Sequence, residues 1–321
     1  MVNLDENLAQ NFLKQQGYLD CKIIKIAGDA SFRSYYRVIY GVKKFILMFA
    51  PPAFEDTKPF IEIDKFLVEN NFSAPKIFAI DEKNGFLLLE DLGDDTYGRV
   101  LANKDDQEFD LYQRSCDVLL ELHKIENLPE IKLYNNAVLC REVMLFIDWY
   151  LVLEKKSIDL KQKAQFKLLW FKLFDLLDKS NQVLVLRDYH ADNLMVLKDR
   201  KNHHKVGLLD FQDALIGSKA YDLVSLLEDA RRDVKLEVKE KIFAYYLEKS
   251  KVDKDQFLID YKILSLQRNV KILGIFARLA LRDNKKHYLN LMPRVLDLVK
   301  QRVFSNDPIF LEIGKFFQKF L

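Results

Sequence analysis

The stretches LRDYHADNLMV (186–196) and VGLLDFQDALIGSKAYDLVSLLED (206–229) decide the fold of this chain. Three polar residues stand in them beside short apolar runs typical of strands: Asp188, then Asn193 five residues later, and Asp210 seventeen residues after that. Carboxylate and amide oxygens suit a hard cation such as Mg²⁺, whereas His and Cys suit zinc. The residue types in this set therefore favour Mg²⁺ over zinc as a bound cation.

This set matches what phosphoryl transfer from a nucleotide needs. One carboxylate accepts the proton of the attacking hydroxyl, and a carboxylate and an amide hold Mg²⁺. Each residue taken alone is better interpreted as a turn former between strands. The complete string with its spacing favours the phosphoryl-transfer interpretation.

Residues 22–91 are typical of a small sheet with one helix. The strand segments are rich in Ile, Val, Tyr and Phe, and the helix has Phe60, Ile63, Phe66 and Leu67 on one face. The predicted order is three strands, a helix and two strands: 22–27, 33–40, 44–49, 59–71, 76–81 and 85–90.

Long helices are predicted beyond residue 93, interrupted by strands between 183 and 211. Apolar residues recur there at spacings of three and four. We therefore expect an α+β fold with two lobes: a small antiparallel-sheet lobe over residues 1–91 and a larger, mostly helical lobe over 92–321. The predicted helices are 106–125, 137–155, 160–178, 219–232, 236–249, 255–282 and a last segment to the end, with a further helix at the N-terminus.

Composition excludes several classes of protein. The 24 Phe and 14 Tyr among 321 residues exclude disorder, and a net charge of +2 argues against a nucleic-acid partner. The 10 Gly include no G-x-G, and Gly93 and Gly98 lack the Lys and Ser/Thr that complete a P-loop. Three dispersed Cys indicate neither a disulfide framework nor a zinc site. Because no signal peptide or long apolar run is apparent, we expect a cytoplasmic protein with no membrane partner.

The two opening stretches resemble the aminoglycoside phosphotransferase and choline kinase superfamily, which has a protein-kinase-like fold. Further segments are similar to bacterial cell-wall sugar kinases, which phosphorylate the anomeric hydroxyl of N-acetylmuramate and N-acetylglucosamine with ATP. These segments are GDASFRSYYRV (28–38), APP (50–52), GFLLLEDLGD (85–94), DLVSLLEDAR (222–231) and QRNVKILGIFARL (267–279).

The resemblance implies a role for each matching residue. Asp188 would be the catalytic base, Asn193 and Asp210 would hold Mg²⁺, and Asp222 would brace the catalytic loop. The residues implied to bind ATP are a phosphate-covering loop with Gly28, Ser31 and Phe32, the mid-strand Met48, and a hinge formed by Glu90, Asp91 and Leu92.

Three positions depart from the kinase pattern. Leu186 replaces the His of H-R-D, and Gln212 replaces the Gly of D-F-G. Met48 stands where the V-A-I-K motif of kinases supplies a phosphate-binding Lys. The sugar-kinase subgroup resembles this chain in having Met at this position. Another cation should then neutralise the phosphates, and the sequence leaves Arg33, Arg37 and Lys44 open. Glu62, the possible helix partner of the missing Lys, is better interpreted as a surface residue.

The acceptor is expected to be a small molecule. Eleven residues separate Asp210 from Asp222 and the chain has no Ala-Pro-Glu, so there is no room for the activation loop of a protein kinase. Arg187, which can dock such a loop, is therefore expected in a local ion pair. Candidate acceptor-binding residues are Asp213, Asp229, Arg231 and Arg268. An aminoglycoside or choline acceptor, and a non-catalytic nucleotide-binding protein, remain alternatives, and the oligomeric state is left open.

Overall fold

The computed structural model describes residues 4–28 and 32–321, and the chain forms two compact units. Unit 1 comprises Met1–Asn103 with Asp192–Asp213, and unit 2 comprises Lys104–Ala191 with Ala214–Leu321. The division differs from the single boundary expected at residues 91–92. The difference arises because the hairpin β7 (Leu194–Val196) and β8 (Val206–Leu208) forms bridges with Ser73 and Thr96 of unit 1.

Unit 1 is built on a five-stranded antiparallel sheet of order β1-β2-β3-β5-β4. Helix α2 (Lys58–Glu69) follows the third strand, so the predicted order of three strands, a helix and two strands is confirmed. The strands are β1 (Lys22–Gly28), β2 (Ser34–Tyr40), β3 (Lys43–Phe49), β4 (Ile77–Asp81) and β5 (Phe86–Glu90).

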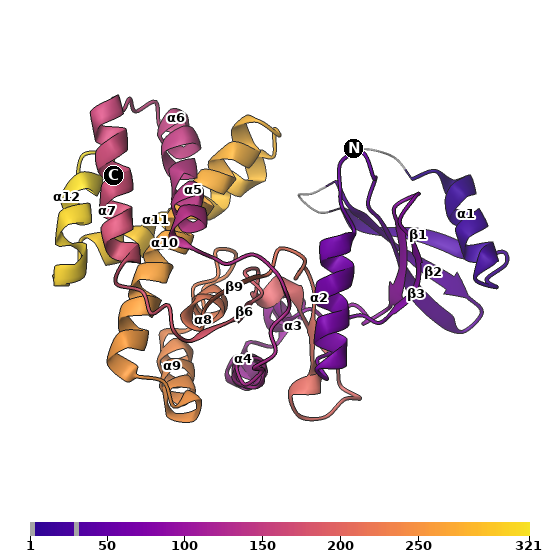
Figure 1. Cartoon of the computed structure of the whole chain (residues 1–321). Coiled ribbons are helices and arrows are strands. Elements are labelled where there is room, and N and C mark those ends of the chain that lie inside the picture. The colour runs from indigo at the N-terminus through magenta and orange to yellow at the C-terminus, as the bar shows by residue number, and fades with distance from the viewer. Residues whose placement is uncertain (1–3, 29–31) are drawn as a thin grey trace. The chain divides into compact units, whose positions relative to one another are not determined.

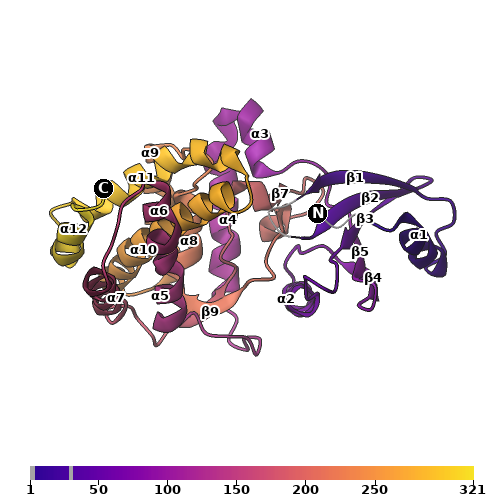
Figure 2. The same ribbon diagram turned by 90° about the horizontal axis from the view of Figure 1, so that it is seen from above.

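One face of this sheet is covered by helix α1 (Glu6–Gln15). The helix begins at Asp5, whose carboxylate accepts hydrogen bonds from the amides of Asn7 and Leu8. Its apolar side chains Phe12 and Leu13 pack into one core with alternate residues of β2, β3 and β5. Figures 1 and 2 show strands of the sheet lying between α1 and α2. The opposite side chains of β2 and β3 are thus available to line a pocket.

The short helix α3 (Tyr97–Asn103) and the β7–β8 hairpin complete unit 1. The sequence did not predict α3. In β8, a Cβ at Gly207 would lie 2.8 Å from the Met195 Cβ and 3.0 Å from a methyl of Leu92. A glycine there lets the hairpin approach the segment after β5 closely.

Unit 2 is mostly helical. Its helices are α4 (Glu108–Leu122), α5 (Asn136–Leu145), α6 (Leu151–Leu153), α7 (Leu160–Phe174), α8 (Ala220–Leu227), α9 (Leu236–Ser250), α10 (Lys254–Leu281), α11 (Met292–Val303) and α12 (Leu311–Phe317). The predicted helix 137–155 contains a π-helical segment at Phe146–Tyr150, between α5 and α6.

Helix α10 is the centre of this unit and packs against α5, α8 and α11 (Figure 2). Most of its 28 residues are buried. A Cβ at Gly274 would lie 2.3 Å from the carbonyl carbon of Leu145, so glycine allows α10 to contact the end of α5.

A two-stranded antiparallel sheet of β6 (Gln182–Val185) and β9 (Leu215–Ser218) precedes α8. The sequence predicted β6 but not β9. Among the described residues, no helix has the length and apolarity to cross a membrane.

Candidate active site

The loop after β6 carries Asp188 and is held by α8. Asp222, in the first turn of α8, accepts hydrogen bonds from the amides of Leu186 at 2.6 Å and Arg187 at 2.8 Å. Burial raises the pKa of Asp222 to about 7, against the effect of these two hydrogen bonds. Arg187 has a left-handed backbone with φ of 69°. Such strain persists where surrounding contacts impose it, and here both amides at the bend are held by one carboxylate.

The Arg187 side chain forms the local ion pair that was expected. Its guanidinium donates to Glu142, which also accepts hydrogen bonds from Tyr134 and Gln267. The Lys271 ammonium lies 3.6 Å from Glu142. Two cations and two hydrogen bonds offset the cost of burying this carboxylate and keep its pKa low. The residue next to Asp188 is therefore anchored through its amide and its side chain.

Two candidate acceptor-binding residues meet the chain that follows Asp188. Asp229 is buried and accepts hydrogen bonds from the amides of Arg231 at 2.8 Å and Ala191 at 3.4 Å. The exposed Arg231 lies 3.0 Å from Nε2 of His190. Burial first, and then the charge of Arg231, lower the pKa of His190 to about 3, so its imidazole is neutral.

The other two acceptor candidates lie elsewhere. Arg268 is buried in α10 and donates to the carbonyl of Glu228 at 3.4 Å. Asp213 is exposed and belongs to unit 1, as the last residue of its second segment.

Asn193 and Asp210 come together in unit 1. Asn193 precedes β7 and Asp210 follows β8, and the pairing of Leu194 with Leu208 brings both to the same end of the hairpin. The Asn193 amide nitrogen lies 3.4 Å from a carboxylate oxygen of Asp210. Gln212, in place of the usual Gly, donates to the other oxygen at 2.9 Å. Asp210 has φ of 58°, a second left-handed residue within the two opening stretches.

This donor pair fits Mg²⁺. It offers one carboxylate and one amide, the hard oxygen donors that Mg²⁺ takes together with water and substrate phosphates. Over residues 4–28 and 32–321, no group of three or more His, Cys, Asp or Glu could hold a metal ion.

A pocket of about 510 Å³ opens beside this pair, entirely within unit 1. Its apolar walls come from Ile26, Ile46, Phe60, Pro75, Leu89, Leu92, Met195, Leu209 and Phe211. The remaining lining consists of Gly93 and of polar or aromatic residues: Tyr35, Arg37, Glu90, Asp91, Asp94, Thr96, Arg99, Asn193 and Asp210. Apolar walls with a few converging polar groups are typical of a small-ligand site.

Only some of the residues expected to bind ATP line this pocket. The hinge residues Glu90, Asp91 and Leu92 line it, whereas Phe32 and Met48 are not among its described lining residues. Gly28 is the last residue of β1. Phe32 stacks on Phe54 instead, with ring centres 4.8 Å apart, and Met48 is fully buried in β3. Ser31 lies outside the described residues.

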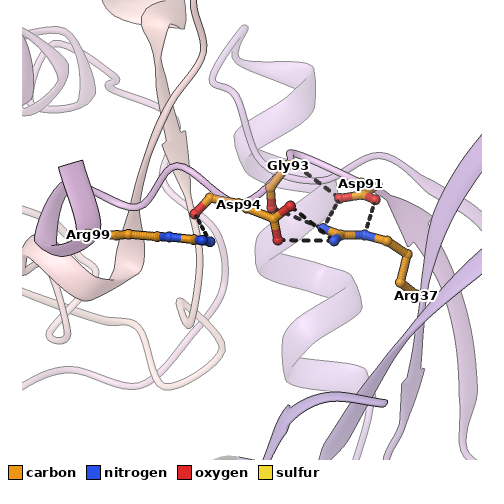
Figure 3. Close-up of polar contacts among 5 residues, drawn as sticks. All are labelled: Arg37, Asp91, Gly93, Asp94 and Arg99. Atoms are coloured by element: carbon orange, nitrogen blue, oxygen red, sulfur yellow. Dashed lines mark hydrogen bonds and ion pairs between the residues drawn. The ribbon is translucent and has the colours of Figure 1, made fainter. Parts of the chain in front are cut away.

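Arg37 of β2 binds the hinge through its whole guanidinium (Figure 3). It donates two hydrogen bonds to Asp91, at 2.6 and 3.0 Å, and two to Asp94, at 3.0 and 3.1 Å. Gly93 donates its amide to Asp91 at 2.9 Å, and Arg99 lies 3.4 Å from the Asp94 carbonyl. The sequence offered Arg37 only as a phosphate-binding candidate, because no local pattern shows which carboxylate a strand residue will meet.

The other basic candidates lie in different surroundings. Arg33 is largely buried and forms ion pairs with Glu55 at 3.8 Å and with Asp210 at 3.9 Å. Lys44 is exposed at the start of β3. Glu62 is also exposed, in agreement with its interpretation as a surface residue. On the same helix, however, Asp64 is buried, and one of its oxygens has no hydrogen-bond partner in the described part of the chain.

The sequence matches the family model described as phosphotransferase enzyme family over residues 22–257. An N-acetylmuramate/N-acetylglucosamine kinase from Caulobacter vibrioides is 31% identical, with 97% of this chain and 95% of the relative covered. A kinase of the same name from Pseudomonas aeruginosa is 33% identical over 92% of this chain and 87% of its own.

Solved structures share the fold at low sequence identity. An aminoglycoside phosphotransferase bound to ADP has a TM-score of 0.62 at 16% identity, covering 93% of this chain and 98% of its own. A choline/ethanolamine kinase family protein from Mesorhizobium loti has a TM-score of 0.66 at 10% identity, covering 98% of this chain and all of the other, 100%. The expected α+β fold, with an antiparallel sheet and a mostly helical part, is confirmed.

Proposed function

The chain belongs to the phosphotransferase enzyme family, and from this premise we propose that it transfers the γ-phosphate of ATP to the anomeric hydroxyl of an amino sugar, N-acetylmuramate or N-acetylglucosamine. The observation that carries the acceptor is the similarity to kinases of that name, at 31% and 33% identity over nearly the whole chain. These identities exceed the 16% and 10% of the aminoglycoside phosphotransferase and choline/ethanolamine kinase structures described above, at similar coverage of this chain.

In this reaction Asp188 is the general base. The acceptor hydroxyl loses its proton to the Asp188 carboxylate while its oxygen forms a bond to the γ-phosphorus. The bond from the γ-phosphorus to the bridging oxygen breaks, and ADP leaves with that electron pair. The support for this role is the loop geometry, in which Asp222 and Glu142 hold the neighbouring Arg187.

The pocket of unit 1 is the proposed nucleotide site. The backbone of Glu90, Asp91 and Leu92 would hold adenine, and Asn193 with Asp210 would hold Mg²⁺ at the phosphates. Bound Mg²⁺ supplies positive charge that offsets the charge developing on the phosphoryl oxygens. The apolar walls of Phe60, Leu92 and Met195 suit a flat base.

The acceptor site is proposed in unit 2, near residues 188–191. Asp229 and Arg231 already contact this segment, and together they offer both a hydrogen-bond acceptor and a cation to a sugar. Arg231 is suited to the lactyl carboxylate of N-acetylmuramate through charge-assisted hydrogen bonds.

A substrate panel tests the acceptor. Purified protein with Mg-ATP is given N-acetylmuramate, N-acetylglucosamine, an aminoglycoside, choline and ethanolamine, and ADP release and phosphorylated products are measured. We expect sugar 1-phosphate from one or both amino sugars. Transfer to choline or an aminoglycoside instead would assign the chain to those acceptors, and tight ATP binding without any transfer would favour a non-catalytic nucleotide-binding protein.

The base is tested by Asp188→Asn. We expect turnover to fall by about 100-fold to 10,000-fold, the usual contribution of a general base, with ADP affinity near that of the wild type. The matched control is Asp199→Asn, which removes the same charge from an exposed loop residue after β7 and should leave turnover unchanged. Full activity of Asp188→Asn would show that another group takes the proton.

A further inference from the structure

The phosphate-binding Lys of kinases is missing in this chain, and the cation that replaces it can be identified within unit 1. The position in β3 holds Met48, which is uncharged and fully buried. The triphosphate of ATP would lie beside Asp210, with Glu55 and Asp213 close by. These carboxylates repel phosphate, so a positive charge at this end of the pocket is needed.

Three side chains of β2 and the residue just before it lie along a path from the hinge toward the proposed metal ligands. Arg33, Tyr35 and Arg37 alternate along the chain into β2, so they share one face of the sheet. Tyr35 and Arg37 line the pocket. At about 3.3 Å for each residue, Arg33 and Arg37 are about 13 Å apart along the strand. Arg37 thus lies at the hinge end of the pocket, and Arg33, which is not itself a lining residue, lies beside the lining residue Asp210.

The two arginines meet different carboxylates. Arg37 is bound at the hinge, where Asp91 and the nearby Asp94 accept hydrogen bonds from all three of its guanidinium nitrogens (Figure 3). Arg33 faces the other end: its NH2 nitrogen lies 3.9 Å from Asp210, the proposed Mg²⁺ ligand. Lys44 is exposed and lies at the hinge end of β3, since the next residue, Phe45, pairs with Glu90. Of the three candidates, Arg33 is therefore the one beside the metal ligands.

The surroundings of Arg33 keep it in place. Glu55 lies 3.8 Å from its Nε and accepts a hydrogen bond from the amide of the preceding residue, Phe32, at 3.0 Å. Backbone and side chain of this segment are thus held by the same carboxylate. The guanidinium remains between Glu55 and Asp210, and its planar fork of N–H donors matches the geometry of a phosphate.

We propose that Arg33 is the phosphate-binding cation of this chain and takes the place of the missing lysine. The inference rests on the proposed ATP site but not on the identity of the acceptor. Arg33 contacts the β- and γ-phosphates when nucleotide is bound, while Glu55 maintains its orientation. Adenosine lacks phosphates, so Arg33 does not contribute to its binding.

The test compares ligands with and without phosphates. Binding of Mg-ADP and of adenosine is measured by calorimetry or by competition for wild type, Arg33→Gln, Arg33→Lys and the control Lys44→Gln. We expect Arg33→Gln to weaken Mg-ADP binding by about tenfold or more, the usual effect of losing a charge-assisted hydrogen bond, with adenosine affinity unchanged. Arg33→Lys should recover part of the loss, and Lys44→Gln, which removes the same charge, should bind both ligands as the wild type does.

The outcomes separate a phosphate-binding role from a structural one. Equal loss of adenosine and Mg-ADP binding in Arg33→Gln would mean that Arg33 only maintains the fold of the segment, and unchanged Mg-ADP binding would exclude it from the phosphate site; either overturns the proposal. Selective loss of Mg-ADP binding supports it even if no amino sugar is phosphorylated, in which case the proposed acceptor fails alone. A wild-type protein that binds no nucleotide overturns both.

Discussion

At the scale of single residues, Arg37 shows how one side chain can determine the shape of a binding pocket. It joins the middle of β2 to the segment after β5 through four hydrogen bonds to Asp91 and Asp94. The Asp91 side chain is only 6% exposed, so its negative charge is stabilised by Arg37 rather than by water. The backbone proposed to hold adenine is therefore fixed by a side chain from another strand.

Replacing Arg37 by Gln should lower stability and loosen the hinge. We expect the free energy of unfolding to fall by about 1–3 kcal/mol, because Asp91 loses its charged partner while it stays buried. Affinity for adenosine and for ADP should fall together, unlike the selective effect at Arg33. Denaturant unfolding and the same binding assay measure both quantities.

The control for this variant is Arg114→Gln. Arg114 pairs with Asp110 one turn away on the solvent-facing side of α4, and such surface pairs contribute about 0–1 kcal/mol. If the stabilities of the Arg37 and Arg114 variants fell equally, the hinge contacts would have no special energetic role.

Asp64 makes stability depend on pH. Burial, and then the charge of Glu90, raise the pKa of Asp64 to about 7 from an ordinary value of 3.8. Between these values the folded protein keeps a proton that the unfolded chain releases, so stability falls as pH rises from about 4 to about 7. Each unit of pKa difference corresponds to about 1.4 kcal/mol.

Asp64→Asn should remove this dependence. The amide cannot ionise, so we expect the variant to become more stable relative to wild type as pH rises from about 4 to about 7, measured by urea unfolding at several pH values. Glu62→Gln, on the exposed side of the same helix, serves as the control and should follow the wild-type profile. Parallel profiles for wild type and Asp64→Asn would contradict the assignment.

At the scale of elements, α8 shapes the loop that carries Asp188. The contact runs from the first turn of the helix, where Asp222 accepts two amides of the bend after β6. Residues 186 and 222 are far apart in sequence, and they meet because α8 directly follows β9, which pairs with β6. Strand β9, which the sequence did not predict, thus explains how Asp222 comes to contact the loop after β6.

Asp222→Ala should leave both amides without an acceptor. We expect a loss of about 2–4 kcal/mol in the free energy of unfolding, from two buried donors, and a lower kcat with little change in KM for ATP. Asp222→Asn keeps one acceptor oxygen and should fall in between. Thermal or denaturant unfolding and steady-state kinetics provide the two readouts.

Asp233→Ala is the matched control, since Asp233 is 78% exposed and pairs with Arg294 at the surface. Its stability should stay within about 0.5 kcal/mol of wild type. An Asp222→Ala protein with wild-type kcat would show that the loop keeps its geometry without the brace.

The predicted elements agree with the structure where the pattern is local. The helices with apolar spacing and the strands of unit 1 occur in the predicted order. Two elements were missed, α3 and β9, which are only seven and four residues long. Short segments carry little periodicity, and β9 depends on pairing with β6 for its hydrogen bonds. The predicted helix 137–155 also contains the π-helical segment at 146–150.

At the scale of the whole molecule, the two units divide the residues of the proposed reaction between them. Asp188 belongs to unit 2, whereas Asn193, Asp210 and the pocket belong to unit 1. The chain passes from one unit to the other between Ala191 and Asp192, only a few residues from Asp188. A boundary drawn along the sequence could not reveal this, because the β7–β8 hairpin joins unit 1 through bridges to Ser73 and Thr96.

The sequence by itself determined the family, the α+β fold and the three polar residues of the opening stretches. The family follows from the resemblance of the quoted segments, whereas the fold and the polar residues follow from local features: apolar periodicity, strand-forming residues, and the fixed spacing of Asp188, Asn193 and Asp210. Only the tertiary structure separated the roles of the basic candidates, with Arg37 at the hinge and Arg33 beside Asp210. The physical reason is that an ion pair depends on which side chains the sheet register and the β7–β8 hairpin bring within a few ångströms, and residues so distant along the chain leave no local pattern of that approach.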